Sequence, residues 1–312
     1  MQGRDLQAIG RSRRRSLLAA GHALNTYLDV MFYDVSCLTQ KEQARLSPRS
    51  SPEGAILIVH PGADSQEIAT LSPLQFIATQ RRAGPAAIDA MVVAGVGSSA
   101  LGTAALARNV ADYLARPVAG VVSGFGMADA LTEALGGWFI LGFKNSIRDT
   151  LAKLFDALDM KDHVWDDESY RSLVKDKEIA GFDMDRFVFG SPDAAALLLA
   201  LYHLQPQIRI LVGHSKGNYV IENALEGLIS LCALKKQSIA TDLQVVTLGA
   251  VVRFPEQFSD VRQFVGTFDG FGMINSRPQS NPSWIAGAWH SLNRNWVGHM
   301  SVQEVLELAG VQ

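Results

Sequence analysis

One short motif carries residue types that could do nucleophilic chemistry. Residues 213–217 read Gly-His-Ser-Lys-Gly and lie between a β-rich run and a helical pattern. A strand that turns sharply into a helix here needs the small Gly213 and Gly217, and it exposes the Ser215 hydroxyl at the carboxyl edge of a sheet. N–H groups at the start of the helix can stabilise developing negative charge. We therefore predict that Ser215 is a nucleophile and that His214 packs away from it, the alternative being a glycine-rich turn with an incidental serine.

A serine nucleophile needs a base to take its proton and an acid to orient that base. Asp269 follows a later β-rich run, residues 261–268, and is the predicted acid. Asp260 and Glu256 are rivals, but both precede that run. A turn aspartate beside a glycine is the structural alternative for Asp269.

Two histidines follow the last apolar run and compete for the role of base. His290 comes directly after residues 284–289. His299 comes just before a predicted final helix, whose start is marked by Ser301 and Glu304 in capping-box spacing. We favour His299 as the base and keep His290 as the reserve.

An oxyanion hole needs two N–H donors. The turn supplies one from Lys216, the residue after the serine. The second is assigned to the loop after an earlier strand, which contains Val96, Gly97 and Ser98. Residues 60–62 end another strand and are the alternative source.

The amino-acid composition excludes several classes of protein. The chain has 312 residues, of which 48% are hydrophobic and 19% charged, so it can bury a large core. A formal charge of -3 gives no field for holding nucleic acid. Cys37 and Cys232 are its only cysteines, which excludes a disulfide scaffold and favours the cytoplasm.

The N-terminal residues are not predicted to be a targeting segment. Four arginines precede a short apolar run that contains His22 and has no clear cleavage site. A solvated helix is expected, with a helix lying on anionic lipid as the alternative. The uncharged run from Ala90 to Ala107 is read as a buried strand entering a helix and not as a membrane span.

Strand and helix patterns alternate from residue 55 onward. The predicted strands are 55–60, 90–96, 117–124, 208–213, 243–252, 261–268 and 284–289, and the clearest helices are 99–115, 193–204 and 218–236. This order predicts an α/β fold with a mostly parallel, doubly wound sheet.

Two stretches interrupt the alternation and define the predicted organisation. Residues 1–50 carry helical or loop patterns and end in a turn-rich linker, so they are predicted to be an N-terminal helical extension. Residues 51–312 form the main domain. Within it, residues 127–192 are too long for a simple connection and are predicted to be an inserted helical cap or lid.

These residues resemble the α/β-hydrolase superfamily, and within it the class 3 lipase-like branch. The resemblance covers roughly residues 85–312 and rests on 210–218 as the nucleophile elbow, 245–258 as the following strand and loop, and 264–273 as the segment that carries the acid. It implies an α/β-hydrolase fold and a Ser-Asp-His hydrolase of carboxylic esters, with no metal and no organic cofactor. The chain departs from the pattern at the oxyanion strand, where Gly-Val-Gly-Ser-Ser replaces the usual His-Gly pair, and in residues 127–192.

Several functions remain open beside ester hydrolysis. The same chemistry with another acceptor or leaving group would make an acyltransferase, a thioesterase or a polyester depolymerase. A hydrolase scaffold can also serve as a non-catalytic binding protein. Gly95, Gly97 and Ala100 match a dinucleotide-binding pattern, but no acidic residue follows the next strand to hold a ribose.

The expected partner is an acyl ester or lipid-like substrate. The tryptophans could line an acyl pocket or pack in the core; they are Trp284, Trp289 and Trp296. Peripheral membrane contact through the N-terminal helix or the cap is an alternative, and no nucleic acid is expected.

Overall fold

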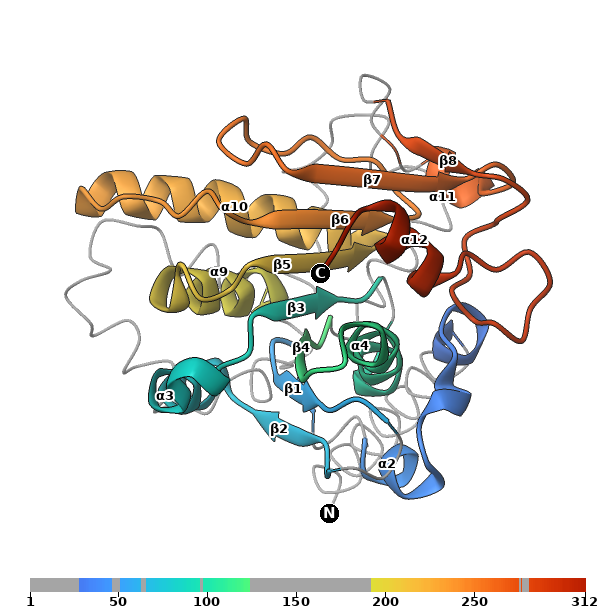
Figure 1. Cartoon of the computed structure of the whole chain (residues 1–312), viewed down its shortest axis with the longest axis horizontal. Coiled ribbons are helices and arrows are strands. Elements are labelled where there is room, and N and C mark those ends of the chain that lie inside the picture. The colour runs from blue at the N-terminus through green and yellow to red at the C-terminus, as the bar shows by residue number, and fades with distance from the viewer. Residues whose placement is uncertain are drawn as a thin grey trace, which may run out of the picture.

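The computed structural model describes residues 28–46, 51–62, 66–95, 98–123, 192–274, 276 and 281–312. Within them lies an eight-stranded sheet with helices on both faces (Figure 1). The predicted cap falls outside the described residues, apart from residue 192.

The sheet is mostly parallel, as predicted. Its strand order is β2-β1-β4-β3-β5-β6-β7-β8. The strands are β1 (Ile56–Val59), β2 (Ala69–Leu71), β3 (Ala90–Val93), β4 (Val118–Val121), β5 (Ile210–His214), β6 (Gln244–Leu248), β7 (Val261–Gly266) and β8 (Ser283–Ile285). Strand β1 is antiparallel to both neighbours, and every pairing from β4 to β8 is parallel. Only β1 therefore runs in the opposite direction, and the carboxyl ends of the other seven strands lie at one edge.

Helices cover both faces because side chains alternate along each strand. Met91 and Val93 join the core under α3 (Pro73–Ala83), α9 (Pro192–Leu204) and α10 (Lys216–Lys235). Ala90 and Val92 join the core under α4 (Ala100–Leu114) and α12 (Val302–Leu308). The short elements are the 3₁₀ helices η1 (Val35–Cys37) and η2 (Gly84–Ala86) and the helices α2 (Gln40–Arg45) and α11 (Gly270–Ile274).

The predicted strands and the three predicted helices are all present. Strand β6 ends at Leu248, earlier than predicted, because Gly249 takes a positive φ of 76° that leaves the extended conformation. The sequence analysis missed β2, which has three residues with little burial and so no apolar signal.

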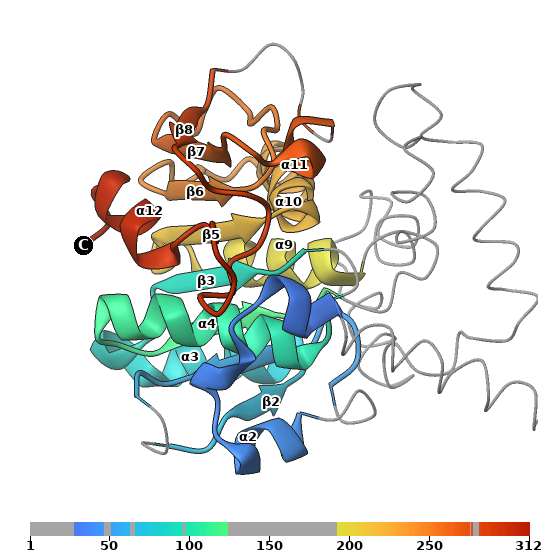
Figure 2. The same cartoon turned by 90° about the vertical axis from the view of Figure 1, so that its right-hand side faces the viewer.

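The domain begins before residue 51. Residues 28–32 are helical, and the following Tyr33, Leu38 and Leu46 are buried in the core under α4. Residues 28–46 of the predicted N-terminal extension are therefore part of the domain, and residues 30–32 pack beside the C-terminal loop, as Figure 2 shows. No helix among the described residues is both long and apolar enough to cross a membrane.

Candidate active site

Ser215 occupies the sharp turn that its sequence motif predicts. It lies between β5 and α10 with φ 54° and ψ -121°, a conformation that a residue with a side chain adopts only under strain. A Cβ atom on Gly213 would lie 2.4 Å from the Asn218 Oδ1 atom, and one on Gly217 would lie 2.2 Å from the Val93 carbonyl oxygen. Both glycines are therefore required by close packing around the turn.

His290 joins Ser215 to Asp269 in one hydrogen-bonded line. The His290 Nε2 atom lies 2.9 Å from the Ser215 Oγ atom. The His290 Nδ1 atom lies 2.9 Å from each carboxylate oxygen of Asp269. Because a carboxylate only accepts, Nδ1 carries the proton and the Nε2 lone pair faces the serine hydroxyl. This tautomer is the one a general base needs.

All three side chains are buried, and further groups hold the acid. Ser215 is 6% exposed, His290 5% and Asp269 1%. The backbone N–H of Gly272, in α11, donates to Asp269 Oδ1 over 2.6 Å. The carboxylate is thus oriented by its own helix as well as by the imidazole.

The parallel strands bring these residues to the same edge of the sheet. Ser215 follows β5, Asp269 follows β7 by three residues, and His290 follows β8 by five. Gly249, after β6, lets backbone pass close to the base: a Cβ atom there would lie 3.0 Å from the His290 Cε1 atom.

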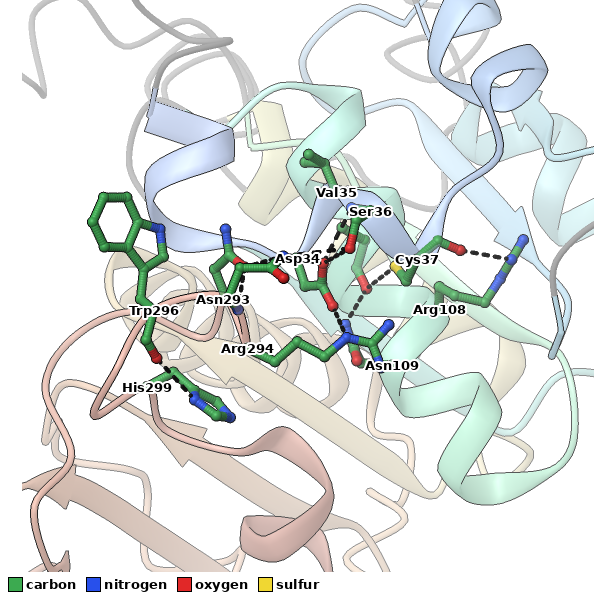
Figure 3. A network of polar contacts seen from close by, with 12 residues as sticks. Asp34, Val35, Ser36, Cys37, Arg108, Asn109, Asn293, Arg294, Trp296 and His299 are labelled. Carbon is green, nitrogen blue, oxygen red and sulfur yellow. Dashed lines mark hydrogen bonds and ion pairs between the residues drawn. The ribbon is translucent and has the colours of Figure 1, made fainter.

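The preference for His299 as the partner of Ser215 is corrected in favour of the reserve, His290. The His299 Nδ1 atom lies 3.1 Å from the Trp296 carbonyl oxygen, and its backbone N–H donates to the same oxygen (Figure 3). This turn keeps the His299 ring at the partly exposed surface of the loop. The predicted capping residue Ser301 does accept from the Glu304 N–H, so the helix start was identified correctly but does not mark the base.

The rival acids lie away from the site. Asp260 precedes β7, at the opposite edge of the sheet, and pairs with Arg262. Glu256 is exposed in the loop before it.

The residues predicted to donate N–H groups to an oxyanion lie in different positions relative to Ser215. Lys216 is the first residue of α10, directly after the serine. The backbone N–H of Ser98 instead donates to the Gly95 carbonyl oxygen over 3.2 Å, and the Ser98 hydroxyl donates to Asp29. Ser98 is thus engaged in holding its own loop, which argues against its prediction as an oxyanion donor. Val96 and Gly97 lie outside the described residues.

The alternative oxyanion loop, residues 60–62, lies at the wrong edge of the sheet. Val59, at the end of β1, pairs with Val118, at the start of β4, because these strands are antiparallel. The Gly62 N–H donates to Asp112, on α4. This loop therefore faces away from Ser215.

His214 points away from the serine hydroxyl, as predicted, but it is more than packing. Its ring is 1% exposed. Its Nδ1 atom lies 2.8 Å from the Tyr33 hydroxyl, and its Nε2 atom lies 3.0 Å from the His290 carbonyl oxygen. Burial, and then the neighbouring His290, hold the pKa of His214 well below its ordinary value, so the ring is neutral.

Sequence reasoning missed the segment that supports the site, residues 28–36, which we call the strap. The strap binds the loop that carries His290 through three hydrogen bonds of 2.7 to 2.8 Å: Asn293 Nδ2 to the Val30 carbonyl, Ser291 Oγ to the Met31 carbonyl, and Leu292 N–H to the Phe32 carbonyl. The Phe32 ring also meets the His290 ring edge-on at 5.6 Å.

The strap has a second set of contacts with α4 and with the same loop. The Asp29 carboxylate accepts hydrogen bonds from Ser98 and Ser99, at the start of α4. Asp34 pairs with Arg294, as Figure 3 shows. The signal that could have revealed the strap is the acidic Asp29 and Asp34 inside an otherwise apolar stretch, since buried charges mark a specific contact.

Apolar side chains lie beside the base. The Phe271 ring, 58% exposed, has its centroid 6.0 Å from that of His290. Phe268, Met273 and Ile274 are also exposed on or next to α11. Trp284 and Trp296 are exposed, and the Trp289 ring packs against the Trp296 ring.

Comparison with known proteins does not identify a family for this chain, so a functional assignment depends on the geometry of the site. No protein-family model, no curated protein and no solved structure matches the chain. Within the described ranges, no group of three or more His, Cys, Asp and Glu side chains could hold a metal ion.

Proposed function

We propose that this protein is a serine hydrolase that cleaves carboxylic esters through Ser215, His290 and Asp269. The observation that carries the proposal is His290, which contacts the serine hydroxyl with one ring nitrogen and a buried carboxylate with the other. A hydroxyl, a base and an orienting acid in this line are what acyl transfer through a covalent intermediate requires.

In the proposed mechanism, the Ser215 Oγ atom attacks the acyl carbonyl while His290 Nε2 takes the hydroxyl proton. The Nδ1–H group of the resulting imidazolium stays hydrogen-bonded to Asp269, which stabilises the positive charge. The Lys216 N–H, at the positive end of the α10 dipole, donates to the oxyanion. His290 then gives the proton to the leaving group. In the second half of the reaction, water attacks the acyl-enzyme while His290 takes its proton, and His290 returns the proton to Ser215 as the carboxylic acid is released.

The arrangement of the sheet supports an α/β-hydrolase fold for this chain. The nucleophile follows a central parallel strand in a Gly-x-Ser-x-Gly turn of strained backbone, and the acid and the histidine follow later strands in the order serine, acid, histidine. This turn and this chain order are features of that superfamily. The class 3 lipase-like resemblance of the sequence agrees with this proposal.

The exposed apolar side chains near His290 favour an apolar acyl or alcohol group on the substrate. Phe271 stands next to the base, and Met273 and Ile274 extend the apolar surface along α11. Apolar surface of this kind beside a site marks where an apolar ligand is bound. Transfer to an acceptor other than water would use the same residues.

The proposal is tested by labelling purified protein with a fluorophosphonate probe and assaying p-nitrophenyl esters from acetate to palmitate. We expect no labelling of Ser215→Ala and at least about 10³-fold slower labelling of His290→Ala, since removing a triad member removes most of the catalysis. His299→Ala is the matched control and should label within about threefold of wild type. A folded wild type that neither labels nor turns over any ester would refute the proposal and leave the non-catalytic binding protein.

A further inference from the structure

A line of hydrogen bonds runs from the backbone of Gly95, just after β3, to the loop that carries His290. The Gly95 N–H lies 2.6 Å from the Tyr33 hydroxyl oxygen. The same hydroxyl lies 2.8 Å from His214 Nδ1, and His214 Nε2 lies 3.0 Å from the His290 carbonyl oxygen. Four residues that are distant in sequence are thus joined in one buried chain.

The direction of every bond in this line follows from its end groups. A backbone N–H only donates and a carbonyl oxygen only accepts. Gly95 therefore donates to the Tyr33 oxygen, and the carbonyl of His290 accepts from His214 Nε2–H. A neutral His214 that is protonated at Nε2 has its lone pair at Nδ1, so the Tyr33 hydroxyl must donate to it. Each group in the line therefore donates to the next one, from the Gly95 N–H to the His290 carbonyl.

Tyr33 is well placed to fix that direction. It is 2% exposed, and its ring meets the His214 ring edge-on at 5.3 Å, so the hydroxyl is held in place by packing. Because Gly95 supplies a donor on one side of the hydroxyl, its single proton points toward His214. Without it, the His214 Nδ1 lone pair and the Gly95 N–H would both lose their partner in this line, and the ring that donates to the His290 carbonyl would be held from one side only.

We propose that Tyr33 is a positioning residue that holds the His214 ring at its Nδ1 atom and thereby holds the backbone of His290, so that the base points at Ser215. This proposal rests on the proposed function for its effect on rate. It adds a residue of the strap, outside the triad, to the machinery of the site. His214, which precedes Ser215 in the sequence, affects the reaction in this proposal only by holding the backbone of His290.

The kinetic test compares Tyr33→Phe with Tyr113→Phe. The Tyr33 substitution keeps the ring and removes only the hydroxyl. The control removes a hydroxyl that donates to the Val311 carbonyl on the far side of α4, over 3.1 Å. We expect Tyr33→Phe to lower kcat on p-nitrophenyl esters and the fluorophosphonate labelling rate about 10- to 100-fold, with KM within about twofold, because small displacements of a catalytic group are this costly. Tyr113→Phe should change neither by more than about twofold.

A second readout does not depend on activity. Nitrogen-15 NMR of histidine-labelled protein should show His214 as the neutral Nε2–H tautomer at neutral pH in wild type. In Tyr33→Phe, the nitrogen shift of His214 Nδ1, which loses its hydrogen-bond donor, and the shift of the His290 Nδ1 proton should both change, whereas Tyr113→Phe should resemble wild type. Loss of folding stability alone would move neither signal in protein that is folded at the measuring temperature.

The two proposals fail in different ways. If wild type does not label, the hydrolase proposal falls, and the NMR comparison still decides whether Tyr33 holds the His214 ring and the backbone of His290. If wild type labels but Tyr33→Phe labels at the same rate with unchanged histidine spectra, the positioning role is overturned. A fall in rate that Tyr113→Phe reproduces would also overturn it, because both substitutions would then act only through stability.

Discussion

Replacing Asp29 by asparagine should make the stability of the protein less dependent on pH. The Asp29 side chain is fully buried, and burial raises its pKa to about 6 from an ordinary 3.8, against the opposing hydrogen bonds from Ser99 and Ser98. Asparagine has nearly the same shape and is neutral at every pH. It can accept from Ser98 and donate to the Ser99 hydroxyl.

The sign follows from proton linkage. Between the two pKa values the folded state binds the proton and the unfolded state does not, so the free energy of unfolding falls as pH rises. The contribution is fully present below pH 3.8 and is lost as the pH rises through about 6. The difference of about two pKa units corresponds to about 3 kcal/mol, of which roughly 2 kcal/mol falls between pH 4.5 and 8.

Urea unfolding of wild type and Asp29→Asn at a series of pH values measures this contribution directly. We expect the free energy of unfolding of the variant, relative to wild type, to increase by roughly 2 kcal/mol from pH 4.5 to 8. Asp242→Asn, which alters a carboxylate 88% exposed, is the control and should give a flat difference. A flat or falling difference for Asp29→Asn would refute the claim that this buried carboxyl resists ionisation.

Two further predictions concern the Ser215 turn and a buried ion pair between α2 and α4. Gly217→Ala places a Cβ atom 2.2 Å from the Val93 carbonyl oxygen, whereas the Cβ atom of Gly270→Ala meets nothing within 4 Å. We expect Gly217→Ala to lower the free energy of unfolding, measured in urea, by about 3 kcal/mol and to slow fluorophosphonate labelling. Equal behaviour of the two variants would contradict the close-packing argument. Glu42→Ala leaves Arg108, 1% exposed in its side chain, without its carboxylate partner, and should cost about 3–5 kcal/mol in the same assay. Glu42→Gln keeps an acceptor for the Thr39 N–H at the helix cap and should cost somewhat less. Equal losses would place the whole effect in the lost charge, and a Glu42→Gln variant as stable as wild type would place it in the cap and contradict the prediction.

The sheet could be predicted from the sequence because its strands are covered on both faces. All four residues of β3 and of β4 are buried, and such strands read as continuous apolar runs. The reversed direction of β1 could not be predicted, since an apolar run has the same composition whichever way it points. Only the pairing of Ile56 with Val121 and of Val59 with Val118 reveals it.

The site could be predicted as far as strand ends determine it. Ser215 and Asp269 sit within a few residues of β5 and β7, so the positions of the strands almost locate them. His290 and His299 share a longer loop, and its path is set by backbone contacts with Val30, Met31 and Phe32. Nothing local in the loop encodes contacts with a segment so distant in the chain.

The strap also imposes an order on how the molecule assembles. The hydrogen bonds between residues 30–31 and residues 291–293 close loops of 260 to 263 residues, which are among the most costly in entropy and the slowest to form. The sheet and its helices can form from nearer contacts, with Ser215 already in its turn. A chain at that stage has Ser215 in place and no fixed position for His290. Under the proposed function, we therefore expect catalytic competence to be acquired last, when two distant parts of the chain meet.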